Sequence, residues 1–235
     1  MAKSNGYVVY NGPSMLDPKS NIVAIITMKT SNAKTGDMAQ LWILDADTNP
    51  VEATKTGQDS SVCGSCPHRH YNGGACYVNV GQAPNSVYKA YKRGSYAFGL
   101  PAYTDKGVRL GAYGDPAALP YIVLYKITAC FSGHTGYTHQ RKHKHFDDRI
   151  LTLVQVSADT PKQALKAQKL GGRTFRVKLV GDSLLPNELE CLADTKGMTC
   201  SECLLCDGNK ANIAITVHGS RSKRFKSQLI ELKEV

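Results

Sequence analysis

The chain has 235 residues, 42% of them apolar and 20% charged, an ordinary globular composition with enough apolar residues for a sizeable core. No apolar run approaches the roughly 18 residues of a membrane span, so we expect no membrane partner. The formal net charge of +10 favours a polyanionic partner, nucleic acid first, although a basic soluble surface would give the same total.

Apolar runs and helical segments alternate in the first half of the chain. Residues 21–28, NIVAIITM, are apolar and β-branched and predict a buried strand. Residues 85–93 predict a helix, and residues 108–113, VRLGAY, predict another strand. The GDP turn at residues 114–116 then leads into a predicted helix over residues 117–128, whose internal proline can delay its start.

The clearest unit is a strand, a helix and a strand in the second half of the chain. Residues 150–156, ILTLVQV, predict a buried strand. Thr160 can cap a helix that begins at Pro161 and stops at a following Gly-Gly pair. Residues 174–180 return as a strand, so the unit predicts a right-handed crossover between parallel strands. Residues 212–217, NIAITV, predict a late strand.

Strands that alternate with helices are typical of an α/β sheet, either open or closed into a barrel. We predict one α/β domain over residues 1–235, in the form of a partial (β/α) barrel with mostly parallel strands. Two cysteine-rich loops, residues 62–79 and 190–208, lie between the predicted elements. Loops at the carboxyl ends of parallel strands carry the chemistry of such folds, so we expect both loops to be functional.

The eight cysteines are the strongest chemical signal in the sequence. The N-terminal stretch MAKSNGYVVYNG has no apolar core of a signal peptide, so we expect a location in a reducing cytoplasm. Clustered cysteines in a cytoplasmic chain of this size bind metal or carry out redox chemistry more often than they form disulfides. Cys130 has no partner by spacing, and we predict a packing role for it.

The second cysteine loop contains Cys191, Cys200, Cys203 and Cys206, the last three at three-residue steps. A structural zinc site prefers two separate knuckles that each give two ligands. Overlapping C-x2-C-x2-C spacing suits a cubane 4Fe–4S cluster better, because each cysteine then takes a different corner. The polar residues around these cysteines argue against simple core packing. We therefore predict an iron–sulfur cluster here, with zinc as the alternative metal.

The first cysteine loop has the spacing Cys63-x2-Cys66-x9-Cys76, with His68 and His70 nearby. This pattern is compatible with a closed zinc site of three cysteines and one histidine. It is equally compatible with a three-cysteine iron–sulfur cluster that leaves one iron free for a ligand or substrate. Spacing does not separate these alternatives, nor does it exclude one site shared by both loops.

Histidines and one aspartate provide further candidates for catalysis. The segment HTGYTHQ contains His134 and His139, which are candidates for acid–base work or metal binding. The RKHKH segment at residues 141–145 is more typical of a solvated or phosphate-facing surface. Asp115 can cap a helix or face a ligand from a strand terminus. The phosphate-loop and hydrolase signatures GxGxxG, GxxxxGK(S/T), GxSxG and HExxH are all absent from the sequence.

Several stretches taken together resemble a family of cysteine-rich proteins carried by bacteriophages and plasmids. They are KTSNAKTGDMAQLWIL, SVCGSCPHR, CYVNVGQAP, VRLGAYGDPAALP, GYTHQ, VSADTPKQALKAQKLGGRTFRV, TCSECLLCDG and TVHG. The resemblance extends from about residue 22 to about residue 218. It implies a viral or mobile-element origin and expression in the cytoplasm of a host bacterium, and it supplies no established activity.

A looser similarity is to radical-SAM enzymes, which have a partial (β/α) barrel with three cysteines after the first strand. This similarity implies that Cys63, Cys66 and Cys76 hold a cluster. It also implies that Gly114 and Asp115 meet the methionine group of S-adenosylmethionine, and that the second loop holds an auxiliary cluster. The spacing differs from the CxxxCxxC of that family, and the acidic residue is Asp rather than Glu.

These observations together predict a phage-type iron–sulfur protein, in the form of a radical-SAM-like enzyme that acts on nucleic acid or a nucleotide. The first loop would hold the reactive cluster and the second a closed one. The alternative is a non-enzymatic zinc protein that binds nucleic acid or a host protein. For either function we predict that two basic segments contact phosphates, through Arg141, Lys142, Lys144, Arg221, Lys223 and Arg224.

Overall fold

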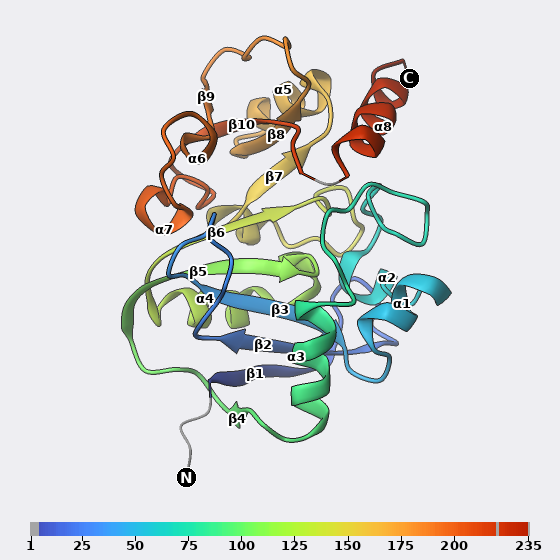
Figure 1. The fold of residues 1–235 in the computed structure, drawn as a ribbon, viewed down its shortest axis with the longest axis vertical. Helices are drawn as coiled ribbons and strands as arrows, with labels where there is room; N and C mark the ends of the chain where they lie inside the picture. Colours follow the sequence, from blue (N-terminus) through green and yellow to red (C-terminus); the bar gives the residue numbers. More distant parts are fainter. Residues whose placement is uncertain (1–4, 220, 235) are drawn as a thin grey trace.

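The computed structural model describes residues 5–219 and 221–234 (Figure 1). The strands in this part of the chain are β1 (Gly6–Pro13), β2 (Asn21–Thr27), β3 (Ala39–Asp45), β4 (Ala97–Phe98), β5 (Thr104–Tyr113), β6 (Phe131–Thr138), β7 (Gln155–Ala158), β8 (Thr174–Lys178), β9 (Glu188–Glu190) and β10 (Asn212–Thr216). The helices are α1 (Pro50–Thr56), α2 (Ser60–Cys63), α3 (Ala83–Lys92), α4 (Tyr121–Thr128), α5 (Pro161–Lys169), α6 (Leu192–Thr195), α7 (Cys200–Cys203) and α8 (Ser222–Glu234), with 3-10 helices η1 (Pro116–Ala118) and η2 (Asp148–Thr152).

The strands form one mixed sheet in the order β4-β1-β2-β3-β5-β6-β7-β8-β10-β9. β2 pairs antiparallel with β1 and with β3. The pairings from β3 through β5, β6, β7, β8 and β10 to β9 are parallel. The α/β class and the mostly parallel strands are therefore confirmed. Strands β4 and β9 are the two ends of this order, and the pairings of the described strands show no barrel.

The core is centred on β2 and β3, whose sequences are nearly continuous apolar runs. Ile22, Ile25, Leu41 and Leu44 are fully buried. Such runs are typical of strands that are covered on both faces. The strand predicted over residues 21–28 is confirmed as β2, although both of its neighbours are antiparallel to it.

The predicted crossover unit is present. β7 and β8 run parallel, with Val156 opposite Thr174. Helix α5 connects them and begins where Thr160 Oγ1 accepts a hydrogen bond from the backbone N–H of Gln163. This N-cap satisfies one of the unpaired donors of the first helical turn, as the sequence predicted.

The strand predicted over residues 150–156 is wrong in its first half. Asp147 accepts a hydrogen bond from the backbone N–H of Arg149 and caps the 3-10 helix η2, so the extended chain of β7 begins only afterwards. Ile150 and Leu153 are buried in the core all the same. A continuous apolar run reports burial, and it does not distinguish a strand from a short buried helix.

The helix predicted over residues 117–128 is divided by Pro120. Asp115 accepts a hydrogen bond from the backbone N–H of Ala117 and caps η1. Leu119 is then extended, with ψ of 149°, because the residue before a proline is sterically disfavoured in the helical region. Helix α4 starts only after the proline.

Three further predicted elements are confirmed with small shifts of their ends. The helix predicted over residues 85–93 is α3, which begins two residues earlier. The strands predicted over residues 108–113 and 212–217 are β5, which is longer, and β10.

Polar residues lie at the carboxyl ends of four neighbouring strands. Asp45 ends β3, Asp115 follows β5, His139 follows β6 and Asp159 follows β7. Because β3, β5, β6 and β7 are parallel, these ends meet at one edge of the sheet. In Figure 1 the loop before α3 (teal) and the C-terminal helix α8 (red) both lie at this edge. The edge therefore brings together segments that are far apart in the sequence.

Candidate metal centres

Arg69 holds the first cysteine loop in shape from within. Its Nη2 donates to Asp59 Oδ1 at 2.5 Å and to the carbonyl of Gly57 at 2.8 Å, and its Nη1 donates to the carbonyl of Gly64 at 3.1 Å. The side chains of Arg69 and Asp59 are only 9% and 2% exposed. A buried guanidinium that is paired and hydrogen-bonded in this way fixes the backbone around it.

Gln140 ties the same loop to the end of β6. Its side-chain amide donates to the carbonyl of Cys63 at 2.9 Å and accepts from the backbone N–H of Ser65 at 3.1 Å. Gly64 is required here, because its φ is +51° and a Cβ would lie 2.3 Å from Gln140 Oε1. Cys63 and Cys66 are therefore positioned by a side chain that follows a different strand.

The thiols of the first loop are free and lie close enough to affect one another electrostatically. Burial raises the pKa of Cys63 well above its ordinary value, and the thiols of Cys66 and Cys76 raise it further. Burial also raises the pKa of Cys76, with a further contribution from Cys66 and an opposing one from the backbone N–H of Val78. A bound cation would lower these thiol pKa values again, since thiolates are the form that coordinates metal.

Tyr113 brings a buried donor to the first loop. This residue is 5% exposed, and its hydroxyl has no hydrogen-bond partner among the described residues. Burial raises the pKa of Tyr113 well above its ordinary value, and the neighbouring Cys63 thiol adds to the rise. A buried hydroxyl without an acceptor is costly, so a sulfur-rich group bound by these cysteines would fit the space by accepting its hydrogen bond.

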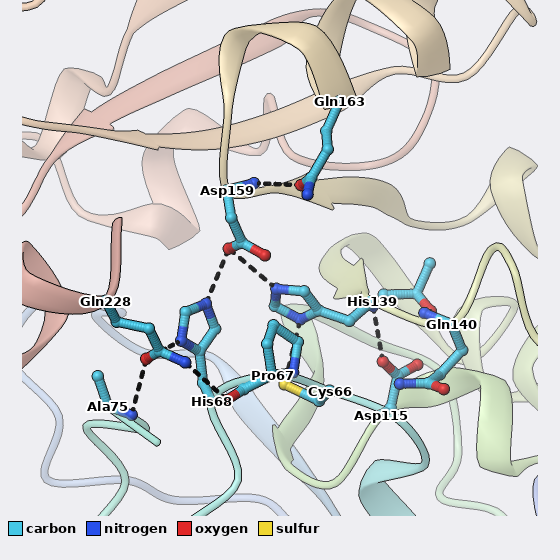
Figure 2. Close-up of polar contacts among 11 residues, drawn as sticks. Cys66, Pro67, His68, Ala75, Asp115, His139, Gln140, Asp159, Gln163 and Gln228 are labelled. Atoms are coloured by element: carbon cyan, nitrogen blue, oxygen red, sulfur yellow. Dashed lines mark hydrogen bonds and ion pairs between the residues drawn. The ribbon is translucent and has the colours of Figure 1, made fainter. Parts of the chain in front are cut away.

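Three side chains converge beside this loop: His68, His139 and Asp159 (Figure 2). Asp159 Oδ1 lies 2.8 Å from His68 Nε2 and 3.5 Å from His139 Nε2. In residues 5–219 and 221–234 this is the only group of three or more His, Cys, Asp or Glu side chains whose ligand atoms all lie within 4.8 Å of one another. His139 Nδ1 also lies 3.6 Å from Cys66 Sγ, so the group adjoins the cysteine loop.

The same contacts shift the protonation of this group. Burial lowers the pKa of His139, but the Cys66 thiol and the Asp159 carboxylate outweigh burial and hold it well above its ordinary value. Burial raises the pKa of Asp159, but His139 and His68 outweigh it and hold that pKa well below the ordinary carboxyl range. Asp159 is therefore an ionised carboxylate that faces two imidazole rings.

Asp115 has the capping role that the sequence offered as one of two alternatives. Its Oδ1 accepts from the backbone N–H of Ala117 at 2.9 Å and its Oδ2 accepts from the backbone N–H of His139 at 2.8 Å. Burial raises the pKa of Asp115 against these hydrogen bonds. The carboxylate thus joins the ends of β5 and β6, while contact of Gly114 and Asp115 with S-adenosylmethionine stays a prediction.

The second cysteine loop is fastened by its backbone. Cys200 and Ser201 donate their N–H groups to the carbonyls of Lys34 and Thr35 at 3.1 Å. Thr199 and Glu202 form a capping box at the start of α7. Cys206 accepts from the backbone N–H of Gly136 in β6 at 2.9 Å, in a further backbone hydrogen bond.

This attachment places the second loop against the sheet rather than at the edge that holds the first. Leu204 packs over β5 and β6, where a Cβ at Gly133 would lie 2.6 Å from Leu204 Cδ1 and one at Gly107 would lie 3.3 Å from Leu204 Cδ2. In Figure 1 α7 (orange) and the teal loop accordingly lie at opposite ends of strands β5 and β6.

The thiols of the second loop are also free and mutually coupled. Burial raises the pKa of Cys206 from 9.0 to about 12, opposed by a hydrogen bond with Tyr137 and assisted by Cys191, Cys200 and Cys203. Burial raises the pKa of Cys200 as well, against the positive charge of Arg109. The four predicted ligands are therefore electrostatic neighbours of one another.

Arg109 lies between the two loops. From β5 its Nη2 donates to Tyr77 Oη at 2.9 Å, and Tyr77 follows Cys76 in the chain. Tyr77, Tyr137 and the Cys200 thiol all raise the pKa of Arg109, against burial. The guanidinium thus contacts the first loop through Tyr77 and acts electrostatically on the second.

The remaining predicted residues lie apart from these centres or at their rims. Cys130 Sγ contacts the carbonyl of Lys126 at 3.4 Å, which agrees with a packing role. His134 Nε2 lies 3.2 Å from the carbonyl of Asp207, beside the second loop, so the structure does not bring it together with His139.

Both predicted basic segments adjoin the first loop. Arg221 Nη1 lies 2.7 Å from His70 Nδ1, and a Cβ at Gly73 would lie 3.1 Å from Arg224 Nη2. Arg141 directly follows Gln140, which holds the loop, and its side chain lies 3.3 Å from an Asp148 carboxylate oxygen. The other basic candidates are exposed: Lys142, Lys144 and Lys223.

Sequence reasoning missed four residues that act on these centres: Tyr113, Asp159, Arg109 and Gln228, whose Oε1 lies 3.0 Å from His68 Nδ1. Asp159 had a usable signal, because it is a polar residue that directly follows a buried strand. The other three had none, since their roles depend on contacts with residues more than thirty positions away in the chain.

Comparison with protein-family models, with curated proteins and with solved structures gives no match for this chain. The resemblance to cysteine-rich phage proteins therefore stays a prediction. Within the described residues, no helix combines the length and the apolar character needed to cross a membrane.

Proposed function

We propose that this chain is an iron–sulfur protein with two cluster sites, one held by Cys63, Cys66 and Cys76 and one by the four cysteines of the second loop. The observation that carries the proposal is that each loop gathers free thiols, and that burial and neighbouring thiols raise the pKa of Cys63 in the first loop and of Cys206 in the second. Buried thiolates need a compensating positive charge, and metal coordination supplies it.

The C-x2-C-x2-C steps of the second loop favour a cluster over a single zinc ion, and the sulfur atoms of the described cysteines are not gathered as one bound zinc ion would hold them. Three thiolates of one tetrahedral zinc at 2.3 Å lie about 3.8 Å from one another. Among the described residues no three cysteine sulfurs all lie within 4.8 Å of one another. The cysteines of a cubane are farther apart, because each one binds a different iron.

The residues around the first loop support a reactive role for its cluster. A reduced cluster with one iron not bound by cysteine would supply the electron that radical-SAM chemistry requires. Tyr113 would donate its free hydroxyl to a cluster or thiolate sulfur, and His139 would donate from Nδ1 to Cys66. Both hydrogen bonds stabilise negative charge on sulfur and so favour the reduced state.

The strand order also supports this assignment. The first cysteine loop comes after β3, the first strand of the parallel series, and Gly114 and Asp115 directly follow the next strand of that series, β5. The basic segments that flank the loop favour a polyanionic substrate, so we propose that the substrate is nucleic acid or a nucleotide.

Anaerobic purification with quantification of iron, sulfide and zinc tests the proposal. We expect about eight iron and eight sulfide per chain from two 4Fe–4S clusters, with a visible absorption that bleaches on reduction. Cys63→Ser and Cys203→Ser should each lose about half of the iron, whereas the matched control Cys130→Ser should lose none. Stoichiometric zinc with no sulfide would contradict the proposal and would support a zinc protein with structural loops.

A further inference from the structure

His68, His139 and Asp159 form a second kind of ligand set, in addition to the thiols. His68 and Asp159 are 5% exposed each, and the three ligand atoms all lie within 4.8 Å of one another. The set joins the first cysteine loop to the carboxyl ends of β6 and β7 (Figure 2). Two imidazole nitrogens and one carboxylate oxygen are a common donor set for divalent transition metals.

The neighbours of Gln228 determine which nitrogen of His68 carries the proton. Gln228 Nε2 donates to the carbonyl of Pro67 at 2.8 Å, and its Oε1 accepts from the backbone N–H of Ala75 at 3.2 Å. These two contacts fix the orientation of the amide, so the atom 3.0 Å from His68 Nδ1 is the acceptor Oε1. His68 must donate from Nδ1, which leaves a lone pair on Nε2 of the neutral ring.

The same assignment holds for His139 if Cys66 is a thiolate ligand, and this step and the next rest on the proposed function. A thiolate accepts, so His139 would donate from Nδ1 to Cys66 Sγ at 3.6 Å. The lone pair of His139 Nε2 then faces Asp159 Oδ1. Both rings thus have the arrangement of metal-binding histidines, in which the second nitrogen is held by an outer acceptor.

Three lone pairs that face one another repel unless a cation or protons lie between them. If Cys66 is a thiolate ligand, protons in this place would require two imidazolium rings, whose centroids are only 5.3 Å apart. Adjacent like charges in a buried site are unfavourable. A single divalent cation would satisfy both rings and the carboxylate at once.

The distances agree with coordination. Ligands placed 2.0–2.1 Å from a tetrahedral ion lie about 3.3 Å from one another. The two measured separations from Asp159 Oδ1 are 2.8 Å and 3.5 Å, which bracket that value. Asp159 is itself anchored, because its backbone N–H donates to Gln163 Oε1 at 2.9 Å.

We propose that His68 Nε2, His139 Nε2 and Asp159 bind one divalent transition-metal ion, separate from the iron of the cysteine loops. The donor set suits Zn²⁺, Fe²⁺ or Co²⁺ rather than Mg²⁺ or Ca²⁺, which prefer oxygen ligands. Three protein ligands leave a coordination position for water or substrate. The ion lies beside the first cysteine loop and the basic segments that flank it, so the substrate class it serves is phosphate-bearing.

Co²⁺ binding to the cluster-loaded protein tests this site. Oxidised 4Fe–4S clusters are diamagnetic, so the paramagnetic resonance of high-spin Co²⁺ can be read beside them. We expect one Co²⁺ per chain in the parent protein and in the exposed-histidine control His145→Gln. Asp159→Asn and His68→Gln should lose it while keeping full iron and sulfide.

Gln228 gives a milder variant for the case in which those substitutions disturb folding. Gln228→Leu removes the acceptor that orients His68 and should weaken Co²⁺ binding roughly 10–100-fold. Gln228→Glu keeps an acceptor and should weaken it less. Absence of Co²⁺ binding by the parent protein, or equal binding by all variants, would overturn the site. Iron and sulfide content is measured separately, so failure of the clusters would be recognised independently of this result.

Discussion

The first cysteine loop lies at the carboxyl edge of the parallel strands, whereas the second is fastened against β5 and β6. The first has three cysteines, a hydroxyl on Tyr113 without a partner among the described residues, and two histidines beside a buried carboxylate. The second has four cysteines, a capping box and backbone hydrogen bonds on both sides. The number of thiols alone would not distinguish a reactive centre from a structural one, so the different roles that we propose for the two loops rest on the groups around the thiols.

The largest expected difference between the loops is in stability, when one proposed ligand is removed from each loop in turn. Cys203→Ser should destabilise the loaded protein by about 4 kcal/mol or more, because a closed metal site contributes directly to folding. For a chain of this size that is a fall in Tm of roughly 8–16 °C. Cys76→Ser should lose the first cluster with a much smaller fall in Tm. Thermal unfolding under anaerobic conditions checks both, and equal falls would remove the distinction between the loops.

Arg69 provides a large effect on the first loop that does not involve a ligand. Arg69→Met leaves Asp59 buried without its partner and should cost about 3–5 kcal/mol. Lys55→Met is the matched control, because Lys55 pairs with Glu52 on the surface at 3.8 Å and should change stability by less than about 0.5 kcal/mol. Chemical denaturation measures both, and a small effect of Arg69→Met would show that the loop is held in another way.

Tyr113→Phe should stabilise the metal-free protein and should lower the reduction potential of the cluster in the loaded protein. Without a cluster the hydroxyl has no acceptor among the described residues, so its removal should stabilise the chain by about 1 kcal/mol. With a cluster, the loss of the hydrogen bond should lower the reduction potential of the first centre. Chemical denaturation of the metal-free protein checks the change in stability, and redox titration of the loaded protein checks the change in reduction potential. A destabilised metal-free variant would mean that the hydroxyl already has an acceptor.

The smallest expected effect concerns His134, which lies beside the second loop. Burial lowers the pKa of His134, so the folded state prefers the neutral ring. The stability that depends on this preference is present above the ordinary histidine pKa and is lost as pH falls below it. His134→Gln should therefore weaken the decline of stability between about pH 7 and pH 5, seen as a flatter dependence of Tm on pH. An unchanged slope would contradict the prediction.

The sequence predicted the α/β class and most elements because apolar runs and caps are local signals. Thr160 capped its helix as expected, whereas residues 150–156 were assigned as a strand because a buried 3-10 turn has the same apolar pattern. Pro120 divided a helix whose composition was otherwise favourable. Where the local pattern allowed more than one secondary structure, tertiary packing and capping determined which one formed.

The candidate centres were predictable only in part, for the same reason. Cysteine spacing predicted candidate ligands, but Asp159 and Gln228 reach the first loop from the end of β7 and from α8, far away in the sequence. Nor did spacing separate the sites, since the position of the second loop depends on Leu204 packing against two glycines of the sheet. The groups that distinguish the two loops are far from the cysteines in the sequence, so local patterns do not reveal them.

Native mass spectrometry of the anaerobically purified chain is the decisive test for the two cluster sites, because it measures the mass of whatever the thiols bind. We expect two successive mass additions of one 4Fe–4S cluster each, with one addition lost in Cys76→Ser and the other in Cys203→Ser. A bare chain, zinc-sized additions, or the loss of two hydrogens per cysteine pair would contradict it.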